Sequence, residues 1–191
     1  MDFQTESLLR GELDSNERLL WSGRPKQGIV FRGSDAFMIP FSLLWGGFAI
    51  FWEFMALSIP SKDTGPVGLI FPIFGIPFVL AGLYMIFGRF IVDAKKRAKT
   101  YYGLSDQRVI ILSGLFGKKI KSLNIRTLTD ISLTEKADGK GTILFGQDNP
   151  WSSWFGGGWF PGMSGAQTPR FEMIADAKII YNKIRNAQQV S

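Results

Sequence analysis

Two long apolar stretches dominate the hydrophobic pattern of this chain. They run from Phe37 to Ile59 and from Val67 to Val92, and only the polar turn 60–66 separates them. A helix needs roughly 20 residues to cross the ~30 Å hydrocarbon core of a bilayer, so each stretch is long enough. The pattern predicts a two-helix transmembrane hairpin over residues 37–92.

The charges on either side of the predicted hairpin indicate its orientation. The turn has one basic residue, Lys62, whereas residues 89–191 carry 16 basic and 8 acidic residues. Lys and Arg are retained on the cytoplasmic side of membranes, so we expect both termini to be cytoplasmic. The N-terminal sequence lacks the basic and apolar regions of a cleavable signal, and the first apolar helix is therefore expected to direct insertion.

Small residues recur along one face of each predicted helix. Gly46, Ala49 and Glu53 lie three or four residues apart in the first helix, and Gly75 and Gly82 lie seven apart in the second. Small residues let helix backbones approach closely in lipid, where packing replaces the hydrophobic effect. These five positions are the predicted helix-packing face.

Glu53 is the sole acid inside either apolar stretch. A carboxylate buried in a membrane is costly unless it is neutralised or paired. It could make a protonated hydrogen bond between the helices or contact another subunit. A position near the outer interface, where it reaches water, is the alternative, and the sequence leaves these interpretations open.

Beyond Lys99 the pattern changes to short runs rich in Ile, Val, Thr, Tyr and Phe, separated by turn residues. The expected strands are 100–104, 107–113, 118–125, 129–135 and 141–146. Such spacing is typical of an antiparallel meander, and the Asp138-Gly139 pair favours a tight hairpin turn. Apolar residues at helical spacing over 173–187 predict an amphipathic helix. A further short strand, followed by a breaker, is expected within 17–25.

Four segments combine these strand and turn features: ERLLWSGRP at 17–25, YYGLSDQRVIILSG at 101–114, LTDI at 128–131 and DGKGTILFG at 138–146. Together with the hairpin, they resemble the bacterial membrane-anchored pleckstrin-homology-like domain proteins. The resemblance implies an α+β fold, with a two-helix transmembrane hairpin plus an antiparallel PH-like β meander closed by a C-terminal amphipathic helix. It also implies the bacterial inner (cytoplasmic) membrane, without implying phosphoinositide binding. Two departures are Asn124, where many relatives have proline, and the long aromatic insertion 147–169.

Three divisions of the chain follow from these observations. We expect a cytoplasmic N-terminal segment at 1–36, the transmembrane hairpin at 37–92, and a cytoplasmic PH-like domain at 93–191 that includes the aromatic Gly/Trp loop 147–169.

Basic residues gather directly after the second apolar stretch. Each Lys or Arg at an anionic leaflet is worth ~1 kcal/mol, so the cluster predicts an anionic-lipid surface, with a simple topology stop as the alternative. Its members are Arg89, Lys95, Lys96, Arg97 and Lys99. A second group, Lys118, Lys119 and Lys121, either extends this surface or protects a strand edge. The aromatic residues do not interleave with basic ones, so we expect no nucleic-acid partner.

The loop 147–169 concentrates aromatic residues among glycines. Tryptophan favours the membrane interface and is enriched at protein interfaces. The predicted partner or membrane contacts are Trp151, Trp154, Phe155, Trp159 and Phe160. Folding of the loop back onto its own sheet is the alternative interpretation.

The chain contains no histidine and no cysteine. Ser-His-Asp and Cys-His nucleophiles and the usual zinc sites are therefore excluded, and no Walker A or Rossmann motif occurs. We expect no enzyme, no cofactor and no metal. The predicted function is a non-catalytic membrane-anchored binding or scaffolding module whose partners are membrane lipid and another membrane protein or a second copy. Lipid-headgroup recognition or lipid handling is the alternative.

Overall fold

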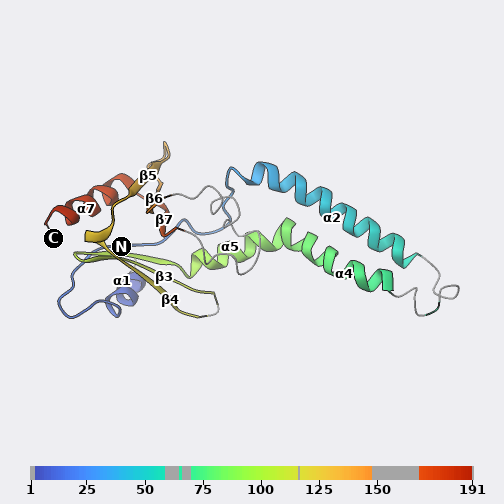
Figure 1. Ribbon diagram of the computed structural model, residues 1–191, viewed down its shortest axis with the longest axis horizontal. Helices are drawn as coiled ribbons and strands as arrows, with labels where there is room; N and C mark the ends of the chain where they lie inside the picture. Colours follow the sequence, from blue (N-terminus) through green and yellow to red (C-terminus); the bar gives the residue numbers. More distant parts are fainter. Residues whose placement is uncertain (1–2, 59–64, 66–69, 116, 148–167, 191) are drawn as a thin grey trace. The chain divides into compact units, whose positions relative to one another are not determined.

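The computed structural model describes residues 3–58, 65, 70–115, 117–147 and 168–190 (Figure 1). The expected mixture of helices and antiparallel strands is confirmed, with two sheets. The chain divides into two compact units. One contains residues 1–30 and 93–191, which we call the sheet unit, and the other contains residues 31–92, which we call the hairpin unit.

The first sheet joins chain segments from both sides of the hairpin unit. Its strands are β1 (Leu19–Gly23), β2 (Tyr101–Ser105), β3 (Arg108–Ser113) and β4 (Lys119–Asn124), hydrogen-bonded in that order. β1 pairs antiparallel with β2, with Ser22 opposite Gly103. The hairpin unit is therefore inserted between two neighbouring strands of one sheet. The sequence-based division assigned these strands to separate segments, because pairing between strands so distant in sequence leaves no local pattern.

The second sheet contains β5 (Ile131–Glu135), β6 (Gly141–Phe145) and β7 (Arg170–Ile174) in that order. The predicted Asp-Gly turn joins β5 to β6, with Gly139 at a φ of +74° and the Lys136 N–H donating to the Lys140 carbonyl at 2.8 Å. β7 was not predicted, because its apolar residues were interpreted as the start of the helix α7, which spans Ala177–Val190.

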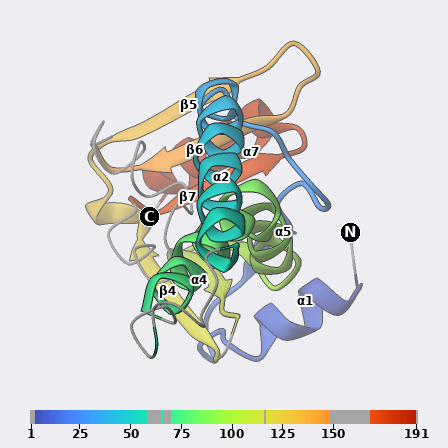
Figure 2. The same cartoon turned by 90° about the vertical axis from the view of Figure 1, so that its right-hand side faces the viewer.

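β3 is buried on both faces and separates two apolar clusters. Val109 and Ile111 point into the larger cluster, where α7 contributes Ile180 and Ile184. Ile110 points the other way, because successive strand residues alternate between faces. There it meets Leu9 of α1 (Phe3–Arg10), a helix that the sequence analysis did not predict. Figures 1 and 2 show α1 and α7 on different sides of the strands.

The hairpin unit contains α2 (Asp35–Leu57), α4 (Ile70–Leu83) and the π-helical turn η2 (Tyr84–Gly88). The turn leads directly into α5 (Arg89–Ala98), so that Ile70–Ala98 forms one helix of 29 residues. Both this helix and α2 are long and apolar enough to cross a membrane. The structure thus contains the two apolar helices that the sequence pattern predicts.

Candidate functional site

Two glycines bring the backbones of α2 and α4 together. A Cβ built on Gly82 would lie 2.9 Å from the Cα of Gly46, and one built on Gly46 would lie 2.8 Å from Cδ1 of Ile86. Ala49 is buried beside them, with 4% of its surface exposed. A side chain at Gly82 would therefore meet the Gly46 backbone and separate the helices, whereas one at Gly46 would meet the flexible end of the Ile86 side chain.

Glu53 meets the other predicted glycine of this face. A Cβ on Gly75 would lie 1.9 Å from Oε2 and 3.1 Å from Cδ of the Glu53 carboxyl. Oε2 is buried, and within the described part of the chain it has no hydrogen-bond partner. The carboxyl tip therefore occupies the space that the missing side chain of Gly75 leaves on α4.

An ion pair joins the polar ends of the hairpin unit. Arg89 Nη1 lies 3.0 Å from Asp35 Oδ1, and the two side chains are only 13% and 11% exposed. The Arg32 N–H donates to Asp35 Oδ2 at 2.7 Å, and the Arg89 guanidinium lies 4.4 Å from the ring centroid of Phe90. Arg89, which the sequence analysis assigned to an anionic-lipid surface, thus contacts protein groups within the hairpin unit.

The other members of the basic cluster belong to the sheet unit and divide into two kinds. Lys95 and Lys99 are exposed and Lys96 is partly exposed. Arg97 is 4% exposed, donates from Nη2 to the Gly28 carbonyl at 2.6 Å and pairs with Asp93 at 3.0 Å.

The segment 24–28 lies beside the end of α5. Arg24 Nη2 donates to the Ala98 carbonyl at 2.6 Å, and Gln27 Nε2 donates to the Arg97 carbonyl at 3.2 Å. The Lys26 N–H donates to the Met173 carbonyl of β7 at 3.2 Å. These bonds connect the chain before the hairpin unit to the chain after it.

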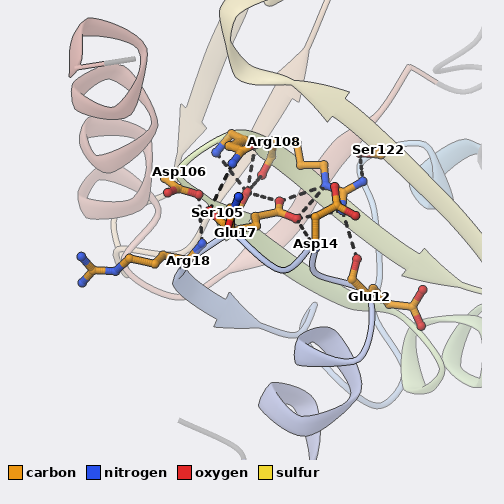
Figure 3. Close-up of polar contacts among 10 residues, drawn as sticks. Glu12, Asp14, Glu17, Arg18, Ser105, Asp106, Arg108 and Ser122 are labelled. Carbon is orange, nitrogen blue, oxygen red and sulfur yellow. Dashed lines mark hydrogen bonds and ion pairs between the residues drawn. The ribbon is translucent and has the colours of Figure 1, made fainter.

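A buried carboxylate fixes the N-terminal segment to the first sheet. Figure 3 shows Glu17 between Arg108 and Ser105. Arg108 donates from Nε and Nη2 to the carboxylate at 2.8–3.1 Å, and the Ser105 hydroxyl donates to Oε1 at 2.5 Å. The Asp14 N–H supplies a further bond to Oε2 at 3.0 Å, and the Glu17 side chain is 0% exposed.

These contacts change the proton affinities of both partners. Burial by itself raises the pKa of Glu17, but the hydrogen bonds from Arg108, Ser105 and Asp14 outweigh it, so the pKa lies below its ordinary value. The hydrogen bonds to Glu17 raise the pKa of Arg108. Both groups therefore stay charged at neutral pH.

The network around Glu17 has the properties of a structural clamp. The Ser105 hydroxyl accepts from the Gln107 and Arg108 N–H groups while donating to Glu17, and Ser105 is 0% exposed. The hydroxyl is therefore buried and holds Glu17 against the turn between β2 and β3. No group of three potential metal ligands occurs among the residues that the structure describes.

A second lysine group lies on and beside β4. Lys118 pairs with Glu12 of the N-terminal segment, and Lys119 is exposed. Burial, followed by the charge of Lys119, lowers the pKa of Lys121. The three lysines are therefore not one uniform charged surface.

Several expected contacts lie outside the described residues. They are Trp151, Trp154, Phe155, Trp159 and Phe160. The pairs Glu17–Arg108 and Asp35–Arg89 were not predicted, because opposite charge at the ends of predicted elements was their only signal in the sequence.

Comparison with known proteins found no significant match for this chain. No protein-family model matches it, and neither the curated proteins nor the solved structures contain a significant match.

Proposed function

We propose that this protein is a non-catalytic, membrane-anchored binding or scaffolding module. In this proposal the sheet unit is a pleckstrin-homology-like domain in which α7 is the closing helix, and α2 and α4 are a transmembrane hairpin. The chain belongs in the bacterial inner (cytoplasmic) membrane with both termini cytoplasmic. Its partner is another membrane protein or a second copy of the chain.

The burial pattern of the hairpin unit is the observation that carries the proposal. Ser42, Gly46 and Ala49 are buried between the helices, whereas the large apolar side chains point outward. Leu44, Phe51 and Phe54 are 73%, 62% and 68% exposed. In water this surface would be a severe aggregation hazard. In lipid it is the expected arrangement, because hydrocarbon solvates large apolar groups while small residues pack.

The polar groups of the sheet unit support a non-catalytic role. Glu17, Arg108 and Ser105 bond to one another and to the backbone. Tyr102 is buried, and its hydroxyl accepts a hydrogen bond from the Glu172 N–H at 3.2 Å. Burial raises the pKa of Tyr102, so this hydroxyl stays protonated.

Exposed apolar side chains on the sheet unit support binding to a protein. Phe3 on α1 is 87% exposed, Ile120 on β4 is 47% exposed and Ile179 on α7 is 57% exposed. β4 is also the last strand of its sheet, so its outer edge lacks a neighbour among the described strands. The aromatic loop 147–169 is the leading contact expected from the sequence, and these positions supplement it.

The test is co-purification of the tagged full chain from membranes in a gentle detergent, with mass spectrometry of the bound proteins. We expect replacement of Trp151, Trp154 and Trp159 by Ala to remove the co-purifying partner while the melting temperature stays unchanged. Interface tryptophans often cost 2 kcal/mol or more on truncation, which is about 30-fold in affinity. Retention of the full set of partners by this variant would contradict the proposal.

Direct recognition of anionic lipid headgroups is a second candidate, and one observation favours it. Among the described residues, two buried N–H positions of Arg97, Nε and Nη1, have no hydrogen-bond partner, and Arg170 has one such position at Nη2. Unsatisfied guanidinium donors are suited to phosphate oxygens.

The lipid candidate is tested with the detergent-solubilised chain. If the candidate is correct, phosphatidylglycerol raises the melting temperature more than phosphatidylcholine does, and Arg97→Gln removes the difference while Lys119→Gln keeps it. Equal effects of the two lipids would argue against it.

A further inference from the structure

Glu53 lies in a part of the chain that has almost no other ionisable groups. Within α2 the other ionisable residue is Asp35 in the first turn, and α4 has none. In the whole sequence from Gly33 to Gly88 the sole basic residue is Lys62. Lys62 lies outside the described residues.

The surroundings of Glu53 on α2 are apolar and face outward. Its sequence neighbours Phe51, Trp52, Phe54 and Met55 are 62%, 44%, 68% and 51% exposed. If the helix crosses a bilayer, these side chains contact hydrocarbon. Water is therefore excluded from this side of α2. The buried oxygen Oε2 must then find its partners within the hairpin unit.

Gly75 on α4 leaves space for the Glu53 carboxyl group but offers it no charged group. Oε2 of Glu53 is buried in the place where a Cβ on Gly75 would lie, 1.9 Å away, and it has no hydrogen-bond partner in the described part of the chain. An ionised Oε2 in this position would lack a cation and a hydrogen-bond donor among the described residues. Protonation removes this cost, because a neutral carboxylic acid is far less strongly solvated than a carboxylate.

We propose that Glu53 is a proton-binding site inside the membrane, where it is held as a neutral carboxylic acid against Gly75. This proposal rests on the membrane placement proposed above. It adds that the contact between Glu53 of α2 and Gly75 of α4 binds a proton. An ion pair with Lys62 is the competing arrangement, and it would leave Glu53 charged.

A hydrophobic carbodiimide distinguishes the two arrangements. Dicyclohexylcarbodiimide dissolves in bilayers and reacts with protonated carboxyl groups. The carboxyl oxygen bonds to the central carbon of the reagent and the acid proton moves to one nitrogen, which gives an O-acylisourea. Transfer of the acyl group to nitrogen then gives a stable N-acylurea that peptide mass spectrometry detects.

The experiment uses the full chain in vesicles at pH 8, where an exposed glutamate with a pKa near 4.3 is almost entirely ionised. We expect labelling at Glu53, none at Asp35, and loss of the label in Glu53→Gln. A water-soluble carbodiimide should leave Glu53 unlabelled. Labelling should also be unchanged in Lys62→Gln. Absence of labelling in the parent chain, or labelling that appears only after Lys62→Gln, would overturn the proposal.

A glycine pair tests the packing itself. Gly75→Ala places a methyl group where Oε2 lies, so the carboxyl must turn toward the lipid, and labelling should become several-fold faster. Gly47→Ala is the matched control, because a Cβ there meets no atom within 4 Å. Equal labelling rates in the two variants would show that the Glu53 carboxyl does not occupy the space left by the missing side chain of Gly75.

The membrane placement is checked in the same samples by flotation of the vesicles after alkaline extraction. A chain that fails to float contradicts the membrane proposal. A chain that floats and stays unlabelled contradicts the Glu53 proposal alone.

Discussion

The sheet unit and the hairpin unit bury opposite kinds of residue. In the sheet unit, Phe171, Ile143 and Ile184 are completely buried. In the hairpin unit, the buried residues of α2 and α4 are mostly small or polar, while Phe54 and Leu44 are 68% and 73% exposed. The sheet unit thus buries large apolar side chains, whereas the hairpin unit buries mostly small and polar ones and exposes the large apolar ones.

The difference is the one expected if the hairpin unit lies in lipid and the sheet unit in water. In water the removal of apolar surface stabilises a fold, so large side chains lie inside. In lipid that driving force is absent between helices, and close backbone approach and internal polar contacts take its place. Asp35–Arg89 and Gly46–Gly82 are contacts of this second kind.

The strongest contrast comes from one substitution made in each unit. Phe171 is 0% exposed and lies against Trp21, Tyr102 and Phe145, with ring centroids 4.7–5.4 Å apart. Phe171→Ala should destabilise the sheet unit by about 3–5 kcal/mol. Phe54→Ala should change the stability of the hairpin unit in lipid by less than about 1 kcal/mol, since lipid refills the space. Hydrogen exchange resolved by peptide reports each unit separately, and equal effects would abolish the contrast.

The buried carboxylate provides the next largest effect. Glu17→Ala leaves Arg108 and the Asp14 N–H without their acceptor, so we expect a loss of about 2–4 kcal/mol, reduced from the value for a fully buried pair because Arg108 is 26% exposed. Glu6→Ala is the control, because Glu6 forms an exposed pair with Arg10 worth about 0.3–0.5 kcal/mol. Exchange protection of β1 should fall only in the first variant. Unchanged protection would show that the clamp does not hold the N-terminal segment.

Overpacking tests the helix contact of the hairpin unit. Gly82→Leu would force a side chain against the Gly46 backbone, which cannot rotate away as a side chain can. By comparison with overpacked soluble cores, the loss should be about 1–3 kcal/mol. Gly47→Leu enters open space and should be nearly neutral. Thermal unfolding in detergent compares the two variants, and similar melting temperatures would place the helix contact elsewhere.

Acid should weaken the sheet unit through Glu17. Its pKa is lowered by folding, so its stabilising contribution is complete above the unfolded value near 4.3 and is lost as pH falls through the folded value. The melting temperature should therefore decline below about pH 4, and Glu17→Gln should make that decline shallower. An identical slope in this variant would assign the acid sensitivity to other carboxylates.

Local patterns were sufficient to predict most individual elements. The apolar stretches correspond to α2 and Ile70–Ala98, and the alternation beyond Lys99 corresponds to β2 through β6. These elements are visible in the sequence because their residues repeat at the period of a strand or helix or form an unbroken apolar run. α1 was missed because it is short, with Leu9 as its one fully buried apolar residue.

Contacts between distant segments could not be predicted in the same way. The β1–β2 pairing and the Glu17–Arg108 bond depend on which strands become neighbours, and a single sequence carries no signal for this. The contact of Glu53 with Gly75 was partly accessible, since both lie on the predicted small-residue faces. The burial of Arg97 could not be predicted, because a basic residue is buried only where acceptors such as the Gly28 carbonyl come close to it.

The central claim is that a membrane hairpin is inserted into a sheet whose strands come from the chain before and after it. Cysteine accessibility in intact cells tests this claim most directly. The chain has no cysteine, so single variants are unambiguous. With an impermeant maleimide, we expect Ser61→Cys to be labelled, while Ser7→Cys and Ser191→Cys react only after the membrane is opened. Labelling of Ser7→Cys or Ser191→Cys in intact cells, with Ser61→Cys protected, would contradict the proposed orientation. Labelling of only one of the Ser7→Cys and Ser191→Cys variants in intact cells would place the N-terminal and C-terminal parts of the sheet unit on different sides of the membrane. That result would contradict the insertion of the hairpin into one sheet.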